Sequence, residues 1–116
     1  MDSPDESLFD KIADAELASL EKAIGDIDPD ECEVEATGGV LTLSFAAGSK
    51  IVVNSHRAAR QMWMAAYLPG QRQAWHFTPH RSDGKWSWSV DSGERAELRA
   101  TLGGLLAAQL GRPFSL

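Results

Sequence analysis

Residues 32–90 form a series of short segments in which apolar and polar side chains alternate, separated by tight turn signals. In the segment VLTLSF, for example, the two leucines and the phenylalanine share one face and the hydroxyl residues share the other. Glycine-rich pairs such as Gly38-Gly39 and Asp83-Gly84 predict turns between such segments. Because the turns are short, successive strands should pair antiparallel. The pattern predicts six strands, at residues 32–36, 40–45, 50–54, 61–67, 74–78 and 85–90.

Two segments with helical periodicity flank this block. Ser3-Pro4-Asp5-Glu6 predicts the start of the first helix, with Ser3 as the N-cap, and Gly25 predicts its end. A second helix is expected after Asp91, a predicted N-cap, with Glu94 three residues later and leucines repeating down to residue 110. The order predicts an α+β fold, a two-layer α/β sandwich whose six-stranded antiparallel sheet packs one face against the N- and C-terminal helices. At 116 residues, the chain 1–116 is expected to form a single domain.

Charge is distributed unevenly along the chain. Residues 1–35 hold thirteen carboxylates and two lysines, a formal charge of −11, whereas residues 36–116 hold nine bases and four acids, a formal charge of +5. Such an acidic third repels phosphate backbones, so nucleic acid is not expected as a partner. It attracts cations or a basic protein surface instead. The alternative is a solvated helix face that only keeps the protein soluble.

Carboxylates are also the one group of residues that could carry metal chemistry. At about 100° per residue, Asp10, Asp14 and Glu21 fall on one side of the first helix, opposite its apolar stripe. Hard cations, including iron, take carboxylate ligands, but an exposed helix face cannot enclose an ion. Binding there should be weak and rich in water. Glu16 interrupts the apolar stripe, and the sequence offers no explanation for it.

Other familiar signatures are absent from the sequence. There is no nucleophile elbow, phosphate-binding loop, dinucleotide fingerprint or zinc-protease motif, so we do not expect an enzyme. The single cysteine, Cys32, lies in an acidic stretch and is expected to be structural, and His76 and His80 are expected to be surface or turn residues. No apolar run is long enough to span a membrane and the N-terminus is acidic, so a cytoplasmic protein without membrane contact is expected.

The strand at 61–67 carries an unusual aromatic pattern. Met62 and Met64 share one face of this strand, while Gln61 and Trp63 share the other. If the methionines face the helices, Trp63 stands on the open face of the sheet near Asn54 and is a candidate contact residue for a partner. The alternative is a buried Trp63 with exposed methionines. The other tryptophans, Trp75, Trp86 and Trp88, are expected in the core.

Three segments together resemble the frataxin family, and in particular its bacterial members. They are GGVLTLSF at 38–45, GSKIVVN at 48–54 and QMWMA at 61–65, and the resemblance continues through GKW at 84–86 and the leucine-rich C-terminal helix. The sequence departs from the family in the segment after Asn54, where His56 stands at a family glutamine. With the acidic first helix, the resemblance covers essentially the whole chain.

The resemblance implies a role as an iron-binding regulator or accessory protein of iron–sulfur cluster assembly that docks on cysteine desulfurase and its scaffold machinery. It implies weak binding of Fe²⁺ or Fe³⁺, a monomer with possible iron-dependent oligomers, and a partner surface at Asn54, Gln61 and Trp63. The carboxylates that it assigns to iron and to docking form a ridge: Asp10, Asp14, Glu21, Asp26, Asp28, Asp30, Glu31, Glu33 and Glu35. Two alternatives stay open, a ferroxidase or iron-storage or chaperone protein that oxidises or delivers Fe²⁺, and an interaction domain with no metal role.

Overall fold

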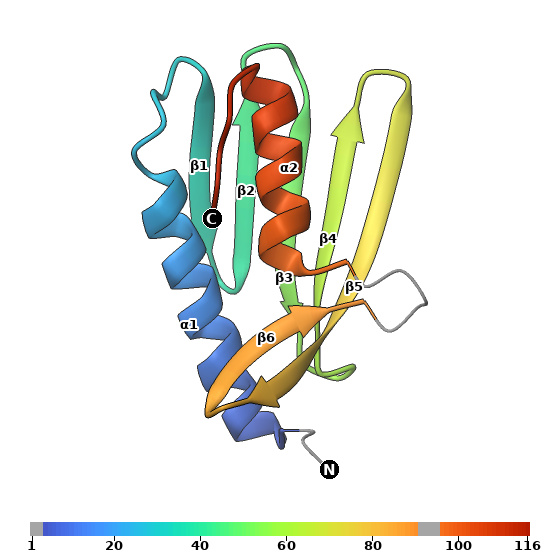
Figure 1. The fold of residues 1–116 in the computed structure, drawn as a ribbon. Helices are drawn as coiled ribbons and strands as arrows, with labels where there is room; N and C mark the ends of the chain where they lie inside the picture. The colour runs from blue at the N-terminus through green and yellow to red at the C-terminus, as the bar shows by residue number, and fades with distance from the viewer. Residues whose placement is uncertain (1–3, 91–95) are drawn as a thin grey trace.

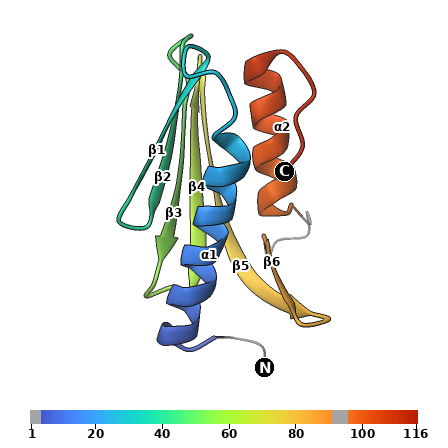
Figure 2. The same cartoon turned by 90° about the vertical axis from the view of Figure 1, so that its left-hand side faces the viewer.

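A computed structural model describes residues 4–90 and 96–116 of the chain. Six strands pair in sequence order into one antiparallel sheet, and both helices lie on the same side of it (Figures 1 and 2). The predicted two-layer α+β architecture is therefore confirmed. The elements are α1 (Glu6–Ile24), β1 (Cys32–Thr37), β2 (Val40–Phe45), β3 (Lys50–His56), β4 (Gln61–Leu68), β5 (Gln71–Ser82), β6 (Lys85–Ser89) and α2 (Leu98–Leu110).

Helix α1 begins slightly later than the sequence predicted. Asp5 is the N-cap, and its side chain accepts a hydrogen bond from the backbone N–H of Leu8 at 2.8 Å, which satisfies one of the free donors of the first turn. Pro4 therefore precedes the cap, and the predicted cap Ser3 lies outside the described residues. Gly25 ends the helix as predicted. The buried stripe of α1 consists of Phe9, Ala13, Leu17, Leu20 and Ile24.

The core lies between the helices and the inner face of the sheet. Strands β2, β3 and β4 contribute alternate buried residues, and Met62 and Met64 are among them, which confirms that the methionines face the helices. Trp88 is buried and meets Phe9 edge to face, with ring centroids 5.9 Å apart. Trp75 and Trp86 are both half-buried. Trp75 packs against the core, as predicted, whereas Trp86 does not.

Strand β5 is much longer than the predicted segment 74–78. Its first half pairs with β4 and its second half pairs with β6. The strand therefore continues past Pro79, although proline usually interrupts strands. Proline weakens a strand only where its missing N–H would join a ladder. Pro79 pairs with Trp88 on the β6 side and lies beyond the residues of β5 that pair with β4, so the strand tolerates it.

Helix α2 begins at Leu98 with Glu97 in the N-cap position, and the predicted capping residues Asp91 and Glu94 lie outside the described residues. Gly111 ends this helix in the left-handed conformation, with a φ of 70°. The C-terminal segment turns back along α2, and a Cβ at Gly103 would lie 3.5 Å from the Phe114 carbonyl oxygen. This is an ordinary van der Waals distance, so the tail lies directly against α2 at this position.

An ion pair between the two helices explains Glu16. The guanidinium of Arg99 on α2 donates to both carboxylate oxygens of Glu16, from Nε to Oε2 at 3.1 Å and from Nη2 to Oε1 at 2.6 Å. Arg99 also donates to Ser19 Oγ at 2.9 Å. This hydrogen bond to Glu16 raises the pKa of Arg99 above its ordinary value, and the nearby carboxylate charge acts in the same direction. The apparent break in the apolar stripe of α1 is thus the contact that joins α1 to α2.

Candidate functional site

Helix α1, the loop that follows it and strand β1 lie on the side of the molecule that faces the viewer in Figure 2, and all three carry carboxylates. On α1, Asp14 and Glu21 point away from the buried stripe and are exposed. On β1, Cys32 is buried and Val34 half-buried toward the helices, so the alternation turns Glu33 and Glu35 outward. We call the exposed set the acidic band: Asp14, Glu21, Asp26, Asp28, Asp30, Glu33 and Glu35.

Three surface hollows share residues of the acidic band. A groove of about 590 Å³ is lined by Glu21, Glu33 and Glu35, together with apolar residues of β1 and the preceding loop. Glu21 also lines a neighbouring hollow of about 210 Å³ with Asp14, beside the β1–β2 turn. Asp30 and Glu33 share a third hollow of about 290 Å³. Carboxylates of the helix and of the strand therefore border one continuous acidic surface.

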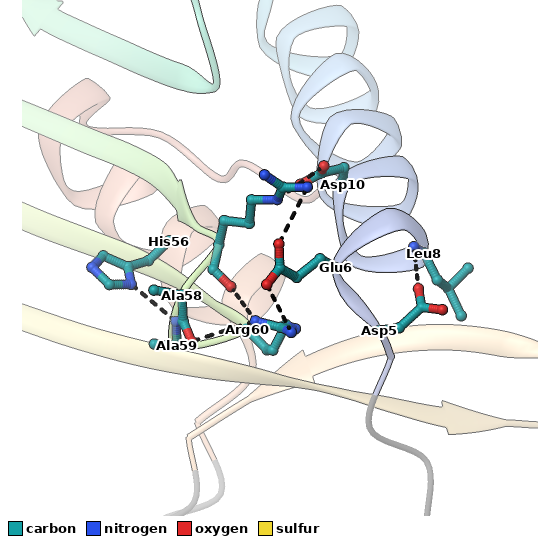
Figure 3. Close-up of polar contacts among 9 residues, drawn as sticks. Asp5, Glu6, Leu8, Asp10, His56, Ala58, Ala59 and Arg60 are labelled. Carbon is teal, nitrogen blue, oxygen red and sulfur yellow. Dashed lines mark hydrogen bonds and ion pairs between the residues drawn. The ribbon is translucent and has the colours of Figure 1, made fainter.

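Two of the carboxylates predicted for the ridge are paired with arginines. Arg57, in the β3–β4 turn, forms ion pairs with Asp10 (Nε to Oδ2, 3.2 Å) and with Glu6 (Nη2 to Oε2, 3.3 Å) (Figure 3). Arg60 of the same turn reaches Glu6 at 3.5 Å. This turn therefore neutralises charge at the N-terminal end of α1. Asp10 lies at the border of the acidic band and is not part of it.

Glu31 is the second paired carboxylate. Arg112, just after α2, donates to both of its oxygens, at 2.5 and 3.0 Å. The hydrogen bond from Arg112 lowers the pKa of Glu31 below its ordinary value. The pair therefore stabilises the folded protein at neutral pH. This stabilisation is lost in acid, as the pH falls through the lowered pKa and Glu31 becomes protonated. Among the described residues, no ion pair joins a lysine or arginine to a carboxylate of the acidic band.

The spacing of the carboxylates in the acidic band determines how they could coordinate a cation. Among residues 4–90 and 96–116, no group of three or more His, Cys, Asp or Glu side chains converges tightly enough to hold a metal ion. The oxygen donors suit hard cations such as iron, but most of the coordination shell would have to be water. Cys32 adds no ligand, because it is buried and burial raises the pKa of its thiol.

The outer face of the sheet carries a second candidate surface. Trp63 pairs with Asn54 on β3 and with His76 on β5, so the predicted neighbourhood of Trp63 and Asn54 is present. The indole is half-buried because two imidazoles stack on it, His56 with centroids 3.8 Å apart and His76 with centroids 4.2 Å apart. Trp63 Nε1 donates to Gln61 Oε1 at 2.9 Å. The outer face of the sheet therefore carries a stack of three rings, His56, Trp63 and His76.

Sequence reasoning missed both histidines of this stack. His76 is exposed, as predicted, but it belongs to β5 and covers one face of Trp63. The hairpin register was the available signal, because counting back from the Leu68–Gln71 turn places His76 directly opposite Trp63. His56 lies diagonally from Trp63 on β3, and its Nδ1 accepts a hydrogen bond from the Ala59 N–H at 3.3 Å (Figure 3).

Comparison with known proteins gives a consistent result. Residues 2–112 match the frataxin-like domain. The iron–sulfur cluster assembly protein CyaY of Ralstonia nicotianae is 38% identical over 108 residues, covering 90% of this chain and 87% of the relative. CyaY of Dechloromonas aromatica is 38% identical over 112 residues, covering 97% of this chain and 98% of the relative. A solved frataxin from Psychromonas ingrahamii has the same fold, with a TM-score of 0.78 at 20% identity over 97% of both chains.

Proposed function

The chain belongs to the frataxin-like family, and from this premise we propose that it serves in iron–sulfur cluster assembly as a binding protein and not as an enzyme. In this role the acidic band docks on a basic surface of cysteine desulfurase. The same carboxylates hold iron weakly, as cargo. The outer face around Asn54, Gln61 and Trp63 provides a second contact with the assembly machinery.

The observation that carries the proposal is a groove bordered by carboxylates of both α1 and β1. Glu21 from α1 lies in the same groove as Glu33 and Glu35 from β1, so negative charge extends across two elements without an arginine between them in the described structure. Such a surface acts at a distance of about one Debye length, roughly 8 Å at physiological salt. It accelerates encounter with a basic partner and repels acidic ones.

Iron binding follows from the same oxygens. A carboxylate pair such as Glu33 and Glu35 offers hard donors, while water completes the shell, so affinity is low and exchange is fast. Low affinity suits a protein that passes iron on. Line broadening of the amide signals of Glu21, Glu33 and Glu35 on addition of iron would support this arrangement. Broadening confined to residues outside the acidic band would exclude it.

Docking is tested with two charge-matched double variants. Asp14→Asn with Glu21→Gln removes two charges from the acidic band, and Asp83→Asn with Glu97→Gln removes two exposed charges elsewhere. We expect the first pair to lower affinity for purified cysteine desulfurase by roughly tenfold at low salt, mainly through slower association. The difference should shrink toward 1 M salt, where the screening length is about 3 Å.

The control pair should bind like the unchanged protein, since it has the same net charge as the first pair but an intact acidic band. Surface plasmon resonance over a range of salt concentrations measures both rates. Equal affinities for the two double variants would show that only net charge matters, and the proposed docking surface would be rejected.

A further inference from the structure

Strand β1 forms one edge of the sheet. In the described part of the chain its only strand partner is β2, and its other edge lies on the side of the sheet toward the viewer in Figure 2. At the opposite edge, β6 is partly covered, because Ser89 makes an isolated bridge with Glu97. An uncovered edge exposes backbone N–H and C=O groups that can pair with another chain.

The turn between β1 and β2 determines which backbone groups face outward. Gly38 and Gly39 have φ angles of 56° and 80°, which is the geometry of a two-residue hairpin turn. In such a hairpin the flanking residues Thr37 and Val40 form a hydrogen-bonded pair, and hydrogen-bonded pairs then recur at every second position. Glu35 and Glu33 are the next hydrogen-bonded residues along β1, opposite Thr42 and Ser44.

Hydrogen bonds on the other side of β2 agree with this assignment. Ser55 N–H donates to the Gly39 carbonyl at 3.0 Å and Phe45 N–H donates to the Ser49 carbonyl at 2.9 Å, so odd-numbered residues of β2 face β3. Even-numbered residues of β2 must therefore face β1. It follows that the backbone N–H and C=O groups of Val34 and Ala36 point away from the sheet.

The same edge is bordered by charge and by an apolar surface. The groove of about 590 Å³ runs beside Val34, with Glu33 and Glu35 on the outer face of the strand and Glu21 on the helix side. Val34 is half-buried and Ala36 is exposed, and among the described residues no backbone hydrogen bond of a turn, loop or cap involves the N–H of either residue. The groove therefore combines free backbone hydrogen-bonding groups, an apolar strip and carboxylates on both sides.

We propose that the free edge of β1 accepts an extended basic segment of a partner protein as an additional strand. Lysine or arginine at alternate positions would lie opposite Glu33 and Glu35, at cross-strand distances of roughly 5 Å, while the intervening apolar residues would pack near Val34. A second copy pairing through its own β1 would place glutamates opposite glutamates, which is unfavourable. The proposal rests on the proposed function only in taking the acidic band as a docking surface for protein.

Hydrogen exchange gives the most specific test. The probe is a blocked Lys-Val-Lys-Val-Lys peptide, with a Glu-Val-Glu-Val-Glu peptide as its charge control. In the free protein, the amides of Val34 and Ala36 should exchange fast and those of Glu33 and Glu35 slowly. The basic peptide should slow exchange at Val34 and Ala36 by at least about tenfold and leave Glu33 and Glu35 little changed, because these two already bond β2.

Two variants of Ala36 separate strand addition from attraction of charge alone. Ala36→Pro removes the outward N–H without removing a β1–β2 hydrogen bond, a position at which an edge strand tolerates proline. Ala36→Val keeps the N–H and is the matched control. We expect the proline variant to bind the basic peptide roughly fivefold more weakly than the valine variant, with all carboxylates intact.

Unchanged exchange at Val34 and Ala36 in the peptide complex would overturn the proposal, even if Ala36→Pro failed to fold. Equal peptide affinity of folded proline and valine variants would also overturn it. If the acidic-band charge variants still lost desulfurase binding in either case, docking through charge would stand without strand addition. Protection of these two amides by self-association, detected by sedimentation without peptide, would instead assign the edge to a second copy and reject the basic partner.

Discussion

Replacing Phe9 with alanine is expected to lower the free energy of unfolding by about 3–5 kcal/mol. The Phe9 side chain is completely buried, and its ring packs edge to face on Trp88, with an interplanar angle of 77°. Phe9 therefore connects the N-terminal part of α1 to β6, two elements that lie far apart in the sequence. The variant would lose apolar burial, leave a cavity and lose the aromatic pair. Denaturant unfolding followed by far-ultraviolet circular dichroism measures the change.

Leu8 provides the matched control, since it precedes Phe9 in the same turn of α1 but is 39% exposed. Leu8→Ala should change the free energy of unfolding by no more than about 0.5 kcal/mol. Similar losses in the two variants would mean that the phenylalanine does not hold α1 to β6 in the way the structure shows.

The second large effect is expected at the contact between the helices. Arg99→Leu should lower the free energy of unfolding by about 2 kcal/mol, because the Glu16 side chain is only 13% exposed and its carboxylate would lose its charged partner. The loss should stay below the roughly 3–5 kcal/mol typical of fully buried pairs, since the arginine is 32% exposed. Thermal unfolding at neutral pH measures it.

A double variant shows whether the unpaired carboxylate causes this loss. Glu16→Leu together with Arg99→Leu leaves no buried charge and should recover most of the stability. Arg112→Leu is the control for a more exposed pair, since the Arg112 and Glu31 side chains are 46% and 40% exposed, and it should lower the free energy of unfolding much less than Arg99→Leu does. If the double leucine variant were as unstable as Arg99→Leu, the loss would come from packing and not from the isolated charge.

Local patterns predicted most of the fold. Alternation and short turns gave all six strands in their order, and the helical stripes gave both helices, because these signals depend on neighbours within a few residues. The predictions failed where the local structure depends on residues far away in the sequence. Strand β5 continues past Pro79 because β6 pairs with it there, and Glu16 is explained by Arg99, which is 83 residues away in sequence.

The same limit applies to the candidate site. Helical periodicity placed Asp14 and Glu21 on an exposed helix face, and the family resemblance added Glu33 and Glu35. The structure brings Glu21, Glu33 and Glu35 to one groove. Periodicity could not show that Arg57 pairs with Asp10 or that Arg112 pairs with Glu31. Those pairs depend on where the β3–β4 turn and the C-terminal tail lie in three dimensions. Asp10 and Glu31 therefore differ from the unpaired carboxylates of the acidic band in the described structure.

The proposed docking of the acidic band on cysteine desulfurase is tested most directly by nuclear magnetic resonance of the ¹⁵N-labelled protein. Unlabelled desulfurase is added, and the broadening of each amide signal is measured at low and at high salt. We expect the strongest broadening at Asp14, Glu21, Glu33 and Glu35, with a marked decrease at high salt. Broadening centred on Asn54, Gln61 and Trp63, with the acidic band unaffected and no dependence on salt, would contradict docking through these carboxylates.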